Sequence, residues 1–120
     1  MEYITLDIKS SMPPADVACA NLEIEIESLA FSDVKLIKVI HGYGSHGVGG
    51  EIKKLMNQRL MILKKQKKIK DFINCEKLSE KVIEDLSLYK NFPQLAIDED
   101  LKNYNSGITL VLLCDNKGNK

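Results

Sequence analysis

The chain has 120 residues, of which 44% are hydrophobic and 28% charged, and its formal net charge at pH 7 is zero. This length and composition predict a single globular domain with its own core over residues 1–114, followed by a disordered tail at 115–120. Zero net charge argues against a generally basic nucleic-acid-binding protein, but eight basic residues and one acid lie between positions 51 and 70. We therefore expect one basic and one acidic surface.

The three cysteines, Cys19, Cys75 and Cys114, are odd in number and widely spaced. This pattern predicts neither a disulfide framework nor a zinc site. No charged-then-apolar leader opens the chain, and no apolar run approaches the roughly 18 residues that a membrane span needs. We expect a cytoplasmic protein with reduced thiols and no membrane association.

Residues 3–8 alternate between apolar and polar side chains, which predicts a strand. Ser11, Pro13 and Pro14 then predict the start of a helix that runs to about residue 29. This helix carries one apolar stripe for the core and a second on another side. We interpret the second stripe as a wide core contact, with a homodimer or protein-partner surface as the alternative. Its members are Val17, Ala20, Ile24 and Phe31.

The apolar run 34–40 predicts a second strand, and a strand–helix–strand segment of this length predicts two adjacent parallel strands. Five of the seven glycines follow directly, between Gly42 and Gly50. Glycines between a strand and a helix let a ligand approach the backbone, and the N–H groups that open the helix favour an anion. We therefore predict a phosphate-binding loop at the carboxyl edge of the sheet.

A helix is predicted over 51–66, and Arg59 falls within its apolar sector, so we expect that side chain to be tethered or to snorkel there. Strands follow at 69–74 and 108–114. Between them, a helical stripe over 75–89 predicts a third helix on the opposite face of the sheet, where it would cover the second strand and one face of the last. The pattern then decays into an acidic loop up to residue 107.

Two short motifs resemble the signatures of the small MutS-related (Smr) domain family. Ile40-His41-Gly42-Tyr43-Gly44 matches the HGxG motif that follows the second strand in that family. Leu6-Asp7-Ile8-Lys9-Ser10 stands where the family has LDxHG, so that Lys9 replaces the histidine and Ser10 the glycine. The resemblance covers about residues 3–74 and 106–114.

The resemblance implies an α/β fold, a βαβα(α)ββ-type sandwich with a four-stranded mixed sheet similar to the C-terminal domain of translation initiation factor three. The helix and acidic loop at 75–107 would be an insertion before the last strand. It also implies binding of DNA or RNA and, as in several branches of the family, endonucleolytic cleavage. The sequence does not choose between RNA and DNA.

Asp7 and His41 are the candidate catalytic residues. A histidine titrates near neutrality and acts as a general acid or base, while Asp7 would orient it or hold Mg²⁺. Lys9 cannot replace a histidine as a base near neutral pH unless its pKa is strongly lowered, so retention of cleavage stays open. The expected contacts to nucleic-acid phosphates are Lys9, Gly42, Tyr43, Gly44, Ser45, His46, Gly47, Lys53 and Lys54.

Other interpretations of the same residues remain. His41 alternatively caps the loop through a backbone hydrogen bond, and the spacing of Asp7, His41 and His46 matches no established metal-ligand pattern, so no metal site is predicted. Gly42, Gly44 and Gly47 spell a dinucleotide fingerprint, but no acidic residue for a ribose follows at the right distance. A catalytically inactive protein-interaction module is the main alternative function.

Overall fold

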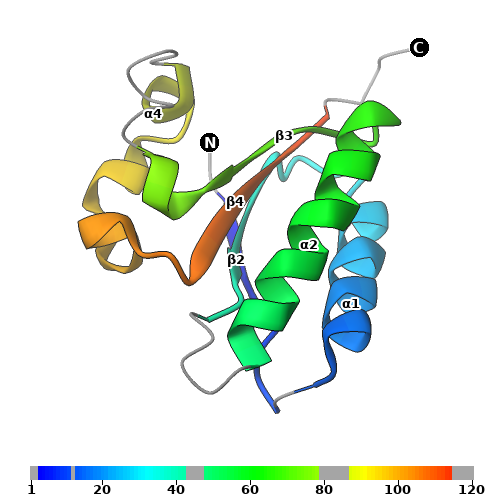
Figure 1. The fold of residues 1–120 in the computed structure, drawn as a ribbon. Helices are drawn as coiled ribbons and strands as arrows, with labels where there is room; N and C mark the ends of the chain where they lie inside the picture. Colours follow the sequence, from blue (N-terminus) through cyan, green and yellow to red (C-terminus); the bar gives the residue numbers. More distant parts are fainter. Residues whose placement is uncertain (1–2, 12, 43–47, 79–86, 115–120) are drawn as a thin grey trace.

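The computed structural model describes residues 3–11, 13–42, 48–78 and 87–114. A four-stranded mixed sheet carries two long helices on one face and a set of short helices on the other (Figure 1). The predicted α/β class with a mixed sheet is confirmed. In chain order, the elements are β1 Ile4–Asp7, α1 Ala15–Ser28, β2 Leu36–Ile40, α2 Val48–Lys65, β3 Ile69–Asn74, the 3₁₀ helix η1 Cys75–Lys77, α4 Ser87–Asn91, the 3₁₀ helices η2 Pro93–Ile97 and η3 Glu99–Tyr104, and β4 Ile108–Leu113.

The strand order is β1-β2-β4-β3, so the last strand of the chain lies inside the sheet. β1 and β2 are parallel neighbours, with Asp7 opposite Ile40, as the crossover rule predicted. β4 pairs antiparallel with both β2 and β3. The carboxyl ends of β1 and β2 therefore meet at one edge, where the chain leads into α1 and α2.

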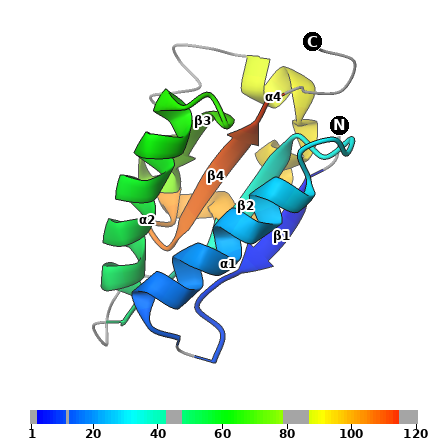
Figure 2. The ribbon, with the colours of Figure 1, turned by 90° about the vertical axis from the view of Figure 1, so that its right-hand side faces the viewer.

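Helices α1 and α2 lie side by side on one face of the sheet (Figure 2). Their buried side chains form one core with Ile37 and Val39 of β2 and Val111 of β4. The tether expected for Arg59 is confirmed, because its guanidinium donates to both carboxylate oxygens of Glu23 on α1, at 2.8 and 2.9 Å. This two-point contact places Glu23 of α1 next to Arg59 of α2.

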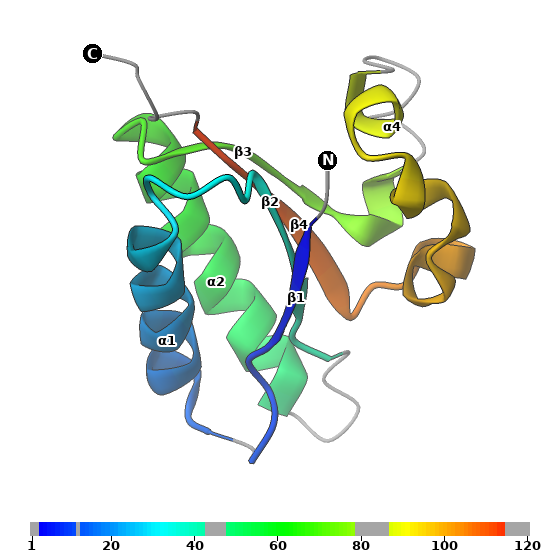
Figure 3. The ribbon, with the colours of Figure 1, turned by 180° about the vertical axis from the view of Figure 1, so that it is seen from behind.

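The segment between β3 and β4 covers the opposite face of the sheet (Figure 3). Leu36 and Leu110 form a second core there with the short helices, and Ile40 packs against it, so the segment between β3 and β4 covers the face on which the third helix was expected. The expected acidic loop over 91–107 is wrong, because η2 and η3 occupy most of it. Leu95 and Leu101 anchor these two helices in the second core, so burial orders a stretch with a weak periodic pattern.

Several predicted boundaries shift. α1 begins at Ala15, after the prolines, rather than at Ser11. α2 begins at Val48, so Gly49 and Gly50 belong to the helix and not to the glycine loop. Glycines are tolerated in a first turn, where the N–H groups have no partner within the helix. Most of the predicted helix at 75–89, and the predicted tail at 115–120, lie outside the described residues.

The second stripe of α1 is not a core contact, which makes that prediction wrong. Val17 is 45% exposed, Ile24 63% and Phe31, in the turn after the helix, 75%. The core is already filled by the first stripe of α1, whose residues Leu22 and Ile26 lie on the other side of the helix. The apolar stripe therefore faces away from the sheet.

A buried cation ties the insertion to the sheet. Lys38 in the middle of β2 is 5% exposed, and its ammonium group donates to Asp98 at 2.9 Å and to Asp100 at 2.8 Å. The Tyr3 hydroxyl also donates to Asp98, at 2.6 Å. Burial lowers the pKa of Lys38 and raises that of Asp98, but these hydrogen bonds outweigh burial in both, so both groups stay charged.

Replacing Lys38 should destabilise the protein strongly. Lys38→Met leaves the Asp98 carboxylate nearly buried without its cation, which typically costs about 3 kcal/mol or more of the free energy of unfolding. Urea unfolding followed by circular dichroism measures this change. The control is Lys54→Met at an exposed position, expected within about 0.5 kcal/mol of the unmodified protein. Equal midpoints for the two variants would contradict the role of the buried ion cluster.

Candidate functional site

The carboxyl edge of β1 and β2 brings the two predicted catalytic residues to the same end of the sheet. Asp7 ends β1, and His41 directly follows the last residue of β2, with Ile8 N donating to Ile40 O at 3.0 Å between them. The two motifs therefore lie next to each other, as predicted. The side chains of Asp7 and His41, however, bind different partners.

Asp7 organises the turn after β1. Its Oδ1 accepts hydrogen bonds from the backbone N–H groups of Lys9 and Ser10, both at 3.0 Å, and the Lys9 ammonium lies 3.9 Å from Oδ2. Ser11, the next residue, has a positive φ of 68°. A carboxylate bound by two successive amides stabilises a tight turn, so Asp7 has a local structural task that needs no ligand.

His41 is fully buried, with 0% exposure. Its Nδ1 lies 3.0 Å from the carbonyl oxygen of Gly42, and its Nε2 lies 2.9 Å from the Thr109 hydroxyl. The Thr109 hydroxyl also lies 2.7 Å from the Asn74 side-chain oxygen. A chain of hydrogen bonds thus links the end of β2 through β4 to the end of β3, and both ring nitrogens have partners other than Asp7.

Burial lowers the pKa of His41 from its usual value to about 4, even though the contact with the Gly42 carbonyl acts in the opposite direction. The ring is therefore neutral near pH 7. This arrangement agrees with the alternative interpretation of His41 as a capping residue.

Gly42 is held against the segment that leads into β4. The backbone N–H groups of His41 and Gly42 both donate to the carbonyl oxygen of Gly107, at 2.9 and 3.1 Å. A Cβ added to Gly107 would lie 3.2 Å from Gly42, and Gly42 itself has a φ of 83°. Both positions therefore favour glycine, and the N–H of Gly42 is already bound within the protein.

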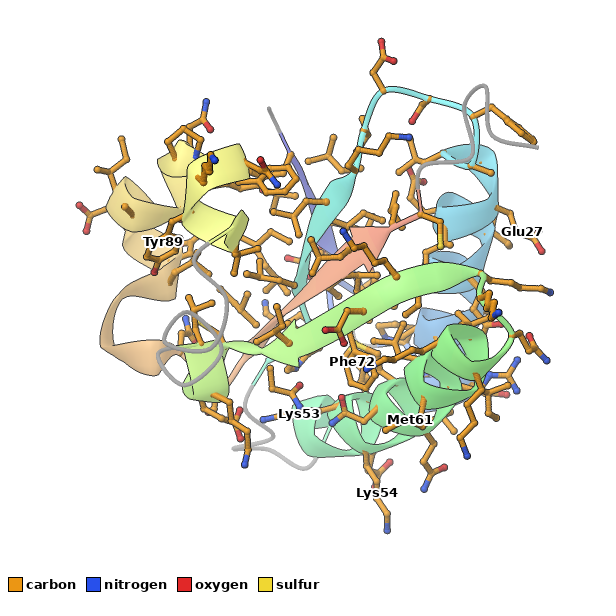
Figure 4. The ribbon with its side chains drawn as sticks, turned by 90° about the horizontal axis from the view of Figure 1, so that it is seen from above. Glu27, Lys53, Lys54, Met61, Phe72 and Tyr89 are labelled. Atoms are coloured by element: carbon orange, nitrogen blue, oxygen red, sulfur yellow. The ribbon has the colours of Figure 1, made fainter. Side chains whose placement is uncertain are left out.

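The two lysines at the start of α2 differ in whether their ammonium groups are free to contact a ligand. Lys53 donates to Glu76 of η1 and to the Ser106 carbonyl, whereas Lys54 is exposed and points away from the sheet (Figure 4). Lys9 is about half exposed beside Asp7. The remaining predicted contacts, Tyr43, Gly44, Ser45, His46 and Gly47, lie outside the described residues, so the phosphate-binding loop itself stays a prediction.

A second group of cations lies at the far end of α2. Lys67, Lys68 and Lys70 occupy the turn after α2 and the start of β3, and all three are exposed. In the part of the chain that the structure describes, no acidic side chain forms an ion pair with any of them, whereas neighbouring Lys64 pairs with Asp71. We call these three lysines the basic corner. α2 has 18 residues and hence spans about 27 Å, so the corner is remote from the first residue of α2.

A groove of about 250 Å³ adjoins the basic corner, between the C-terminal ends of α1 and α2. Lys67 and Lys68 share it with Glu23 and Glu27, and its floor is apolar. The two carboxylates make it a poor phosphate pocket. Within the described residues, no group of three or more potential metal ligands is assembled, and no helix is long and apolar enough to cross a membrane.

Comparison with protein-family models, with curated proteins and with solved structures finds no significant match to this chain. The Smr resemblance, and the Mg²⁺ and nucleic-acid chemistry that it implies, therefore stay predictions that depend on the motifs alone.

The partners of the buried polar side chains Lys38, His41 and Thr109 were not predicted from the sequence. Thr109 is the only polar residue of β4, and Lys38 interrupts the apolar run of β2. A polar residue inside a strand covered on both faces needs a partner. That rule could have predicted an acidic partner for Lys38, whereas the pairing of Thr109 with His41 depends on the strand order.

The pKa of His41 gives a direct test of its burial. In a His46→Gln background, His41 is the only histidine, and NMR titration of its ring protons should give a pKa near 4. Since the unfolded chain titrates near 6.5, the folded state is stabilised above that pH and loses up to about 3 kcal/mol as the pH falls from 6.5 to 4. A titration midpoint near 6.5 would contradict the buried, hydrogen-bonded ring.

Proposed function

We propose that this chain binds the phosphate backbone of nucleic acids, with the basic corner as its principal contact. The observation that carries the proposal is the exposure of Lys67, Lys68 and Lys70 together without ion pairs among the described residues. Charges that have no internal partner remain available to release counterions from a polyanion, which supplies most of the affinity in non-specific binding.

Lys9 and Lys54 at the carboxyl edge are the second expected contact, together with the glycine loop. The ~27 Å length of α2 separates this edge from the basic corner, so the two contacts belong to an extended path and not to one pocket. The family resemblance supports the same ligand class. We also propose a cytoplasmic location, which the three free cysteines support.

We propose binding without cleavage by His41. A general acid or base must reach the reacting phosphate, directly or through one water molecule. His41 is fully buried, both of its ring nitrogens have partners, and its lowered pKa leaves it neutral at pH 7. The endonuclease activity that the resemblance implies therefore has no accessible histidine at this position.

Charge reversal should locate the binding surface. Lys68→Glu with Lys70→Glu removes two corner contacts and leaves Lys67, whose φ of 63° is sensitive to substitution, untouched. Fluorescence anisotropy with duplex DNA, single-stranded DNA and RNA should show at least tenfold weaker binding for every ligand. The slope of log K against log[salt] should fall by about 2.

Two matched variants complete the experiment. Lys77→Glu with Lys90→Glu makes the same charge change on exposed lysines of the insertion and should leave affinity within about twofold. Lys9→Glu with Lys54→Glu tests the carboxyl edge and should weaken binding less than the corner variant does. Equal losses in all three variants would show only an effect of net charge and would overturn the proposal.

A further inference from the structure

The outer surface of α1 is apolar, although nothing within the described chain covers it. Val17, Ile24 and Phe31 are 45%, 63% and 75% exposed, and Ala20 between them is also exposed. Isolated exposed apolar residues are common, but two large ones on one side of α1, with a third in the turn that follows it, are typical of a contact surface.

The charges that α1 itself carries are all negative, although Arg59 of α2 pairs with one of them, Glu23, and Lys67 and Lys68 share a groove with Glu23 and Glu27. α1 contains one aspartate and three glutamates and no basic residue, and Glu27, three residues after Ile24, is exposed and points outward from the helix (Figure 4). Two α1 helices packed against each other would therefore bring like charges together. The stripe needs a partner whose apolar surface has a basic border.

Helix α2 carries such a surface. Met61 and Ile62 are 47% and 48% exposed, and the exposed Lys65 follows them one turn later. Glu51, in the first turn, is the only acidic residue of α2. The complement of the α1 stripe is thus present on the adjacent helix of the same molecule, where α1 cannot reach it.

The internal alignment of the helices sets which residues would meet. Glu23 of α1 is level with Arg59 of α2, because their side chains form a two-point ion pair. Both helices run in the same direction, since each follows one of two parallel strands (Figure 2). Ile24 is therefore level with the Met61 region within one helical turn, and Glu27 with the Lys65 region.

We propose that the outer surfaces of α1 and α2 together form a homodimer interface, in which α1 of each copy packs against α2 of the other. A two-fold axis parallel to the helices keeps residues at the same height. Ile24 then contacts Met61 and Ile62 of the second copy, and Glu27 lies opposite Lys65 of the second copy. The symmetry repeats each contact, so the interface closes on itself and does not extend into a fibre.

The expected dimer is weak. α1 is about 21 Å long, and two helix contacts of this length place the interface near the lower limit of about 1,000 Å² for a specific assembly. We therefore expect a dissociation constant in the micromolar range, roughly 1–100 µM. The basic corner lies beyond this contact, so dimerisation and phosphate binding are tested by different variants.

Sedimentation velocity of the full chain over a concentration series should show a reversible monomer–dimer equilibrium. Ile24→Glu should raise the dissociation constant at least tenfold. The matched control is Ile97→Glu on η2, which introduces the same charge at a residue 76% exposed on the other face of the sheet and should leave the equilibrium unchanged. Circular dichroism checks that both variants fold, which we expect because both positions are exposed.

A charge swap identifies the contact itself. Glu27→Lys and Lys65→Glu should each weaken the dimer severalfold, and the double variant should restore it, because the pair meets between copies. A monomer at every concentration would overturn the proposal, as would equal effects of Ile24→Glu and Ile97→Glu. A dimer that the double variant fails to restore would also overturn the proposed pairing. None of these outcomes alters the prediction for Lys68 and Lys70 with nucleic acids.

Discussion

The structure depends on covering both faces of its two inner strands. β2 and β4 are apolar at almost every position, so each needs a packed layer on either side. Helices α1 and α2 supply one layer. The chain between β3 and β4 supplies the other, which explains why it folds into short helices although its sequence pattern is weak. The segment between β3 and β4 is thus part of the core of the protein.

The buried polar side chains Lys38, His41 and Thr109 make this arrangement specific. Lys38 can sit inside the sheet only because the insertion brings Asp98 and Asp100 over it. His41 can be buried only because Thr109 of the last strand lies beside it. A purely apolar layer would tolerate a shift of the packed segments along the sheet. In any other register, Lys38 and His41 would be buried without hydrogen-bond partners, which would cost free energy. The same contacts explain why the HGxG histidine of this chain serves the fold.

The surface charges divide the molecule into separate regions, to which the two proposals assign different ligands. The basic corner at the end of α2 has cations without partners among the described residues and suits a polyanion. The outer helical face combines apolar side chains with acids on α1 and lysines on α2, and suits a second copy. The two surfaces share α2 but use different residues. Because the proposed two-fold axis is parallel to the helices, a dimer would present two basic corners at the same end and would increase the avidity for a long nucleic acid.

The sequence by itself determined the four strands, the two long helices and the parallel crossover, because each follows from local periodicity or from the length of the connection between the first two strands. It also placed Asp7 and His41 at one edge. Only the tertiary structure decided that β4 lies inside the sheet, that His41 is buried and that the second stripe of α1 is exposed. These features depend on which distant segments meet, and burial of one residue is a property of its neighbours in space, which no local pattern records.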